Sequence, residues 1–111
     1  MVTIVTEVEL KEGADRQWDA IMAARMTEAR KRPGWVGGQL LSSENVPQKR
    51  VIVGTWMTRA DWEGWHEDPL FAETRRQLDA LVNGSERHEW HDVLLDVRKG
   101  RVAAGSAASR R

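Results

Sequence analysis

The 111-residue chain contains no cysteine and no tyrosine, and it has only one phenylalanine and three prolines. The absence of cysteine excludes disulfides, thiolate nucleophiles, iron–sulfur clusters and zinc sites with cysteine ligands. No apolar run approaches the ~20 residues that a bilayer-spanning helix requires. The N-terminus also has no basic segment followed by an apolar one, so we expect no signal peptide. These absences predict a soluble, cytoplasmic protein without a membrane contact.

Acidic residues are missing from the C-terminal end. All 17 of them lie within residues 1–97 together with 12 basic residues, which gives this part a net charge of −5. A nucleic-acid-binding protein needs a basic face, so we expect no nucleic-acid partner. Residues 98–111 are basic and rich in glycine, alanine and serine, and they have too few large apolar residues to offset their ordering entropy. We therefore predict one domain, residues 1–97, followed by a disordered tail, residues 98–111.

Apolar residues recur with two different spacings in the first third of the chain. Apolar residues alternate over residues 2–11, which predicts a half-buried strand. Over residues 14–31 they recur every three or four positions, which predicts an amphipathic helix ended by Pro33 and Gly34. The apolar stripe of this helix consists of Trp18, Ile21, Met22, Met26 and Ala29.

The rest of the chain predicts three more strands and two short helices. The expected order is strands 35–43 and 49–57 in a hairpin, a helix capped by Thr58 or Asp61, a helix from Pro69 to about residue 82, a turn at 83–85 and a strand at 86–97. The apolar run 93–95 suggests that this last strand is buried on both faces. The fold class is α+β, a ferredoxin-like split β-α-β with a four-stranded antiparallel sheet and helices on one face.

The predicted strands carry apolar residues on both faces, as at Ile52 and Val53. The sheet face without helices must be polar or covered by something outside the chain. A small domain also benefits when a partner subunit covers apolar surface. A second copy packed sheet to sheet satisfies both conditions, so we predict a homodimer.

Tryptophan is the abundant aromatic residue, with six copies at positions 18, 35, 56, 62, 65 and 90. Its large rigid ring and single N–H suit a flat aromatic ligand that is held by stacking and oriented by a few polar contacts. Trp18 lies in the apolar stripe of the first helix and is assigned to the core. Trp62 and Trp65 share a helix face, so at least one of them should point inward.

Several of these residues fall in a recognisable pattern. Trp56 ends a strand, Thr58-Arg59-Ala60-Asp61 begins a helix, and Trp65-His66 is followed by Asp68-Pro69-Leu70-Phe71. This pattern resembles the antibiotic biosynthesis monooxygenase (ABM) family over about residues 2–97, most clearly at 33–41 and 56–78. The resemblance implies a dimeric α+β barrel, with a pocket between the sheet and helices of each subunit.

The anthrone-oxidising members of this family use O2 without metal, haem or flavin. The resemblance places their tryptophan at Trp56 and their arginine at Arg75, whereas their tyrosine and asparagine positions hold Trp62 and Ile52. It implies a small cofactor-independent monooxygenase that oxidises an anthrone-, quinol- or polyketide-like aromatic substrate.

The haem-degrading members imply an alternative with haem as cofactor. Their tryptophan corresponds to Trp65, but their asparagine position holds Thr6 and their iron-ligating histidine position holds Thr74. Haem binding with altered ligands, and non-catalytic binding of a small aromatic molecule, are the two alternatives to cofactor-free oxidation.

The candidate site follows from this family resemblance. Arg75 and a tryptophan N–H would stabilise a deprotonated phenol or anthrone, which can then pass an electron to O2. His66 or a water would be the base, although a histidine at an acidic helix end is also typical of a surface residue. The catalytic candidates are Trp56, Arg75, Trp65 and His66, and the substrate-binding candidates are Trp62, Trp35, Thr6, Ile52, Phe71 and Thr74. We expect no metal site, because His88 and His91 would lie on opposite faces of a strand.

Overall fold

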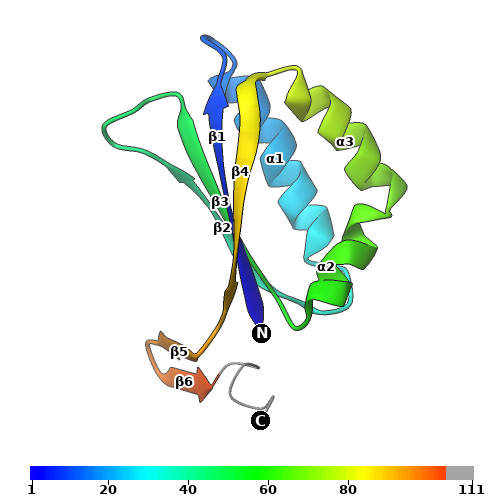
Figure 1. Ribbon diagram of the computed structural model, residues 1–111, viewed down its shortest axis with the longest axis vertical. Coiled ribbons are helices and arrows are strands. Elements are labelled where there is room, and N and C mark those ends of the chain that lie inside the picture. The colour runs from blue at the N-terminus through cyan, green and yellow to red at the C-terminus, as the bar shows by residue number, and fades with distance from the viewer. Residues whose placement is uncertain (105–111) are drawn as a thin grey trace.

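The computed structural model describes residues 1–104, in which three helices cover one face of a four-stranded antiparallel sheet (Figure 1). The strands are β1 (Val2–Leu10), β2 (Trp35–Ser42), β3 (Lys49–Trp56) and β4 (Val82–Asp92), in the order β2-β3-β1-β4. The helices are α1 (Asp15–Ala29), α2 (Arg59–His66) and α3 (Pro69–Asp79). The predicted α+β, ferredoxin-like class is confirmed. None of these helices is long and apolar enough to cross a bilayer.

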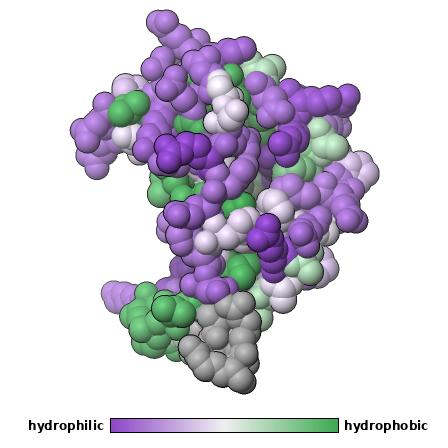
Figure 2. All heavy atoms as spheres, in the orientation of Figure 1, coloured by the Kyte–Doolittle hydropathy of each residue, from purple (hydrophilic) through white to green (hydrophobic). Residues whose placement is uncertain are grey.

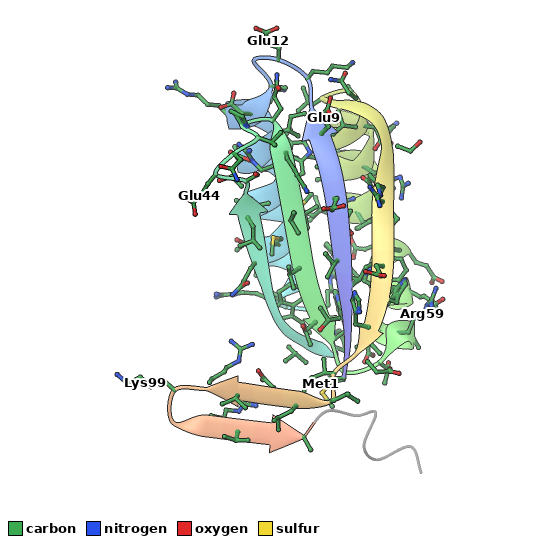
Figure 3. The ribbon with its side chains drawn as sticks, turned by 60° about the vertical axis from the view of Figure 1, so that its left-hand side comes forward. Met1, Glu9, Glu12, Glu44, Arg59 and Lys99 are labelled. Atoms are coloured by element: carbon green, nitrogen blue, oxygen red, sulfur yellow. The ribbon has the colours of Figure 1, made fainter. Side chains whose placement is uncertain are left out.

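The strand register decides which side chains face the helices. Thr6 of β1 lies between Ile52 of β3 and His88 of β4. Since side chains alternate along a strand, these three residues point toward the helices, and their neighbours Val5 and Val53 point to the open face. Figure 3 views the sheet from this open side, with the helices behind it.

The predicted stripe of α1 packs into the core as expected. Trp18, Met22 and Ala29 are buried, and Ile21 and Met26 pack against them. A second buried cluster contains Ala29, Trp56, Trp65 and Phe71. This second cluster joins α1 to α2, α3 and the end of β3.

Side-chain caps fix the two short helices. The hydroxyl of Thr58 accepts a hydrogen bond from the backbone N–H of Asp61 at 3.1 Å and so caps α2. Asp68 accepts one from the N–H of Leu70 at 2.9 Å and caps α3, which then begins with Pro69. Thr58 is one of the two caps expected for α2, and Pro69 begins α3 as expected, whereas the cap by Asp68 was not predicted.

The turn expected at residues 83–85 is wrong. These residues belong to β4, and Gly84 has a φ of +69° there. The register of β1 against β4 shifts between Glu7 and Glu9. The positive φ of the glycine accommodates this irregularity in the strand pairing, and the chain does not reverse direction there.

The expected buried strand at residues 93–95 is also wrong. β4 ends at Asp92, and Leu94 and Leu95 are 70% and 61% exposed. The chain continues into a separate hairpin of β5 (Leu95–Arg98) and β6 (Arg101–Ala104), which turns at Gly100 with a φ of +79°.

This hairpin corrects the expectation of a disordered tail from residue 98, because residues 98–104 form paired strands. The remainder of that tail, residues 105–111, lies outside the described residues. The hairpin projects beyond the end of the main sheet, and Figure 2 shows its apolar surface.

Candidate functional site

A cavity of about 150 Å³ lies between the sheet and the helices. The floor includes Ile4, Thr6 and Ile52 from the sheet, and α1, α2 and α3 supply the walls. Cavities of this size that are lined by apolar groups can admit a benzene-sized ligand. The geometry therefore suits part of a flat ring system, with the rest of the ligand reaching toward solvent.

Nine of the ten residues predicted for the site line this cavity. The exception is Thr74, whose hydroxyl donates to the backbone carbonyls of Leu70 and Phe71 at 2.9 and 3.1 Å. This side chain satisfies its own helix and does not line the cavity. The lining residues are Trp56, Arg75, Trp65, His66, Trp62, Trp35, Thr6, Ile52 and Phe71. Their action on a substrate stays a prediction.

Aromatic rings form much of the cavity wall. Trp56 is almost fully buried, and Trp35 meets it edge to face, with ring centroids 5.2 Å apart. Trp65 meets Phe71 in the same way at 5.8 Å. Such edge-to-face pairs are favourable and hold the rings in fixed positions. The tryptophans from α2 and from the sheet thus border one shared space.

Glycine shapes this space on the sheet side. Gly38 of β2 pairs with Gly54 of β3. A Cβ at Gly38 would lie 2.7 Å from the ring of Trp35 and 2.8 Å from the terminal methyl of Met26. Any larger residue at this position would push Trp35 or Met26 aside, so Gly38 fixes the width of the site.

His66 is a half-buried residue of the cavity wall, which corrects the expectation of a surface histidine. Its ring lies 3.6 Å from that of Trp62 and 3.8 Å from that of Phe71. Its Nδ1 lies 2.9 Å from the carbonyl oxygen of Trp62, which can only accept, so Nδ1 carries the hydrogen. The lone pair of the neutral ring is therefore on Nε2.

The surroundings of His66 keep it neutral. Burial lowers its pKa to about 4, and the positive charges of Arg25 and Arg75 act in the same direction. The hydrogen bond to Trp62 opposes this shift without cancelling it. His66 can accept a hydrogen bond near neutral pH, but it is a weak general base because the best base has a pKa near the working pH.

A second histidine of the cavity lining, His88 of β4, lies in a chain of hydrogen bonds. Nε2 of His88 lies 3.1 Å from the carboxylate of Glu86, so this nitrogen donates. Nδ1 of His88 lies 3.0 Å from the hydroxyl of Thr6, which lines the cavity floor. In the neutral ring Nδ1 accepts, so the three groups form a path for a proton from the buried hydroxyl to the exposed imidazole.

Sequence reasoning treated His88 as a structural or surface residue and did not connect it with Thr6 and Glu86. The signal was present, because residues 86, 88 and 90 lie on the same face of a strand. The pairing of His88 with Thr6, 82 positions apart, could only come from the sheet register.

Two arginines line the cavity, and they differ sharply. Arg75, predicted from the resemblance, has a side chain that is 55% exposed and lies 3.8 Å from the carboxylate of Asp79. Arg25 of α1, which was not predicted, packs 3.5 Å above the ring of Phe71 and donates to its carbonyl oxygen at 3.0 Å. Its position seven residues after Trp18 put it on the apolar stripe, which is an unusual place for a charge.

The side chains of residues 1–104 do not reproduce the haem ligands that the resemblance implies. Residues 1–104 contain no cluster of three or more acidic or histidine side chains able to hold a metal ion. Thr74 stands at the position that the resemblance gives to the iron ligand, and its hydroxyl is turned to its own helix. His88 uses both ring nitrogens in the contacts with Glu86 and Thr6.

Comparisons with known proteins identify the family and the fold. Residues 1–77 match the family model described as antibiotic biosynthesis monooxygenase. Among solved structures, SnoaB from Streptomyces nogalater, described as a cofactor-independent oxygenase, is 21% identical with a TM-score of 0.74 and 81% and 89% coverage of this chain and of that chain. Rv0793 from Mycobacterium tuberculosis is 16% identical with a TM-score of 0.78, and the match covers 87% and 98%.

A curated relative, protein SchA of Streptomyces halstedii, is 25% identical over 103 residues, which is 93% of this chain. The chain spans about a quarter of the length of that relative. The structural likenesses, at these identities, establish the fold.

Proposed function

Because the chain belongs to the antibiotic biosynthesis monooxygenase family, we propose that it is a small, cytoplasmic, cofactor-independent monooxygenase that oxidises an anthrone- or quinol-like aromatic substrate with O2. The observation that carries the proposal is the single cavity bordered by Trp35, Trp56, Trp62 and Trp65, which also contains charged and hydrogen-bonding groups. The description of the similar SnoaB as a cofactor-independent oxygenase supports it. The lack of a matching haem ligand at Thr74 favours this reaction over the haem alternative.

The chemistry requires no external reductant. Removal of a proton from the methylene of an anthrone gives an electron-rich anion, which transfers an electron to O2. The two radicals combine to form a carbon–oxygen bond, and the resulting peroxide loses water as its O–O bond breaks. One oxygen atom remains as the new carbonyl, and the other leaves as water with the two hydrogens of the methylene. The protein must stabilise the anion, hold it against O2 and exclude water.

The residues can be assigned to these tasks. The rings of Trp56, Trp62 and Trp65 would hold the substrate plane, and Arg75 would attract the anion at the cavity edge. His66 would accept a hydrogen bond through Nε2 and position the substrate. Its low pKa makes it a weak base. We therefore assign proton removal to Thr6 and His88, with Glu86 holding the imidazole in the accepting tautomer.

We also propose that the protein acts as a homodimer. The open face of the sheet carries Val5, Val53 and the hydrogen-bonded pair Thr3 and Thr55, whose hydroxyls are 2.7 Å apart. Apolar residues and satisfied polar groups suit a face that packs against another sheet. The ion pair of Glu7 with Lys49, 2.9 Å long, lies on the same face and would set the orientation of the partner.

The first test follows dissolved oxygen after mixing the protein with an anthrone. We expect uptake above the spontaneous rate, with one O2 consumed for each quinone formed. His88→Gln should lower the rate about 100-fold, because general base catalysis contributes roughly that much. Arg16→Gln, an exposed change on α1 outside the cavity, is the matched control and should keep the rate.

Two results would count against this proposal. If His88→Gln kept the wild-type rate, the base would be assigned wrongly even if the oxidation were real. If anthrones and quinols bound to the cavity but oxygen uptake stayed at the blank rate, the protein would be a binder of aromatic molecules and the oxygenase proposal would fail.

A further inference from the structure

Arg25 places a cation inside the cavity. The residue is half-buried on α1, its guanidinium stacks on Phe71, and one Nη donates to the Phe71 carbonyl at 3.0 Å. Its Nε is buried and has no hydrogen-bond partner, and Arg25 lines the cavity. A buried donor without a partner costs stability, and more so when it belongs to a charged group. Nε itself has almost no exposed surface, so a ligand could pair only with the Nη donors that the Phe71 carbonyl leaves free.

No carboxylate within residues 1–104 forms an ion pair with Arg25. The two acidic residues of the cavity are Glu86 and Asp79, and each has another partner. Glu86 lies 3.1 Å from His88, and Asp79 lies 3.8 Å from Arg75. Burial lowers the pKa of Arg25 to about 10, so the guanidinium still keeps its charge near neutral pH. Glu86 and Asp79 favour the charged form of Arg25 from a distance, but neither is in ion-pair contact with it, so the guanidinium lacks a directly bound counter-ion.

We propose that Arg25 binds an anionic oxygen of the ligand, so that the site selects flat aromatic acids, with a carboxylate or an ionised phenol or enol beside the guanidinium. The carboxylate or phenolate oxygen would accept from the Nη donors of Arg25 that the Phe71 carbonyl leaves free. Guanidinium groups recognise such oxygens well because several planar donors point the same way. The ring system would then extend along the tryptophan wall. That this ligand is the substrate rests on the proposed function.

The proposal separates the roles of the two arginines. Arg75 is exposed and has Asp79 as a partner, so its charge is screened by water and shared. Arg25 is half-buried and stacks on Phe71, so an added anion would be screened less there than beside Arg75. The affinity for an anionic ligand should therefore depend on Arg25 more than on Arg75.

Calorimetric titration with anthracene-2-carboxylate and anthracene-2-carboxamide tests the proposal, because the two have the same shape and differ in charge. Wild-type protein should bind the acid at least tenfold more tightly than the amide. Arg25→Gln should remove this preference, and Arg25→Lys, which keeps the charge but loses the planar donors, should keep part of it. Arg16→Gln changes the same charge on an exposed part of α1 and should leave the preference intact.

Equal affinity of wild-type protein for acid and amide overturns the proposal, as does failure of the acid to bind at millimolar concentration. This comparison on the wild-type protein remains decisive if Arg25→Gln fails to fold. Neither ligand is oxidised in the titration, so the result is independent of turnover. A strong preference for the acid without oxygen uptake on any anthrone would retain the anion site and overturn only the oxygenase proposal.

Discussion

His66 shows how a single side chain couples the site to stability. The folded protein holds its ring neutral between Trp62 and Phe71, with a pKa of about 4 in place of the usual 6.5. The unfolded chain therefore binds a proton at a higher pH than the folded chain does. The contribution of His66 is fully present above about pH 6.5 and is lost as the pH falls toward 4.

We predict that the free energy of unfolding falls by roughly 1–2 kcal/mol from this residue between pH 7 and pH 4.5. A pKa shift of this size in a fully enclosed group would correspond to about 3 kcal/mol of unfolding free energy. The partial exposure of His66 reduces this value. Urea denaturation at the two pH values measures the change.

The matched control for this prediction is His66→Gln, which removes the titration. The variant carries all the acidic groups of the wild type, so subtracting its pH effect isolates His66. An identical loss of stability in both proteins would mean that the ring is not held neutral.

Individual residues also mark the limit of sequence reasoning. Trp56, Trp62 and Trp65 were expected at the site from the resemblance to the ABM family, and all three line the cavity. Arg25 could be flagged only as a charge on an apolar stripe. Its missing counter-ion depends on where Glu86 and Asp79 turn, and only packing determines that.

At the level of elements, α2 matters most because it carries Trp62, Trp65 and His66 within eight residues. A helix of this length has little stability of its own and depends on its cap and on packing. The cap is Thr58, whose hydroxyl accepts from the N–H of Asp61.

We predict that Thr58→Ala destabilises the protein by about 1 kcal/mol, because the first turn loses its hydrogen-bond acceptor. Thr58→Ser keeps the hydroxyl and should keep most of the stability, as measured by urea denaturation. Ligand affinity should weaken in Thr58→Ala as well, since α2 positions three rings of the site. Equal stability of the alanine and serine variants would show that the cap is not important.

The long periodic elements could be read from the sequence, whereas the C-terminal ones could not. The apolar stripe of α1 and the alternating apolar residues of β1 are clear patterns in the sequence, because one face of each element is buried. Gly84 belongs to a triplet typical of a turn, yet it lies within β4. Its positive φ occurs where the pairing of β1 with β4 is irregular. Leu94 and Leu95 look like core residues, but β4 leaves the sheet before them, and local pattern carries no information about that exit.

Considered as a whole, the molecule has two apolar surfaces that its own helices do not cover. One is the valine patch around Val5 and Val53 on the open face of the sheet, opposite all three helices (Figures 1 and 3), with charged residues such as Glu7 and Glu89 beside it. The other is the β5–β6 hairpin, where Val97 and Val102 are exposed on a ribbon beyond the end of the sheet. Isolated two-stranded hairpins are at best marginally stable in water, so this one needs a surface to pack against.

A homodimer formed through the open face would bury the first surface and bring a second copy close to the hairpin. We predict that the wild-type protein is a dimer at micromolar concentration and that Val53→Lys converts it to a folded monomer. The lysine would put a charge without a partner at the centre of the interface, where it cannot keep its water. Sedimentation equilibrium gives the mass, and circular dichroism checks the fold.

Val46→Lys is the matched control, because it makes the same change in the exposed loop between β2 and β3, away from the open face. It should leave the dimer intact. A wild-type monomer at these concentrations would contradict the prediction, and so would a dimer that persists in Val53→Lys. The cavity is lined from within one chain, so a folded Val53→Lys monomer should still prefer aromatic acids. A loss of that preference in the monomer would mean that the partner subunit completes the site.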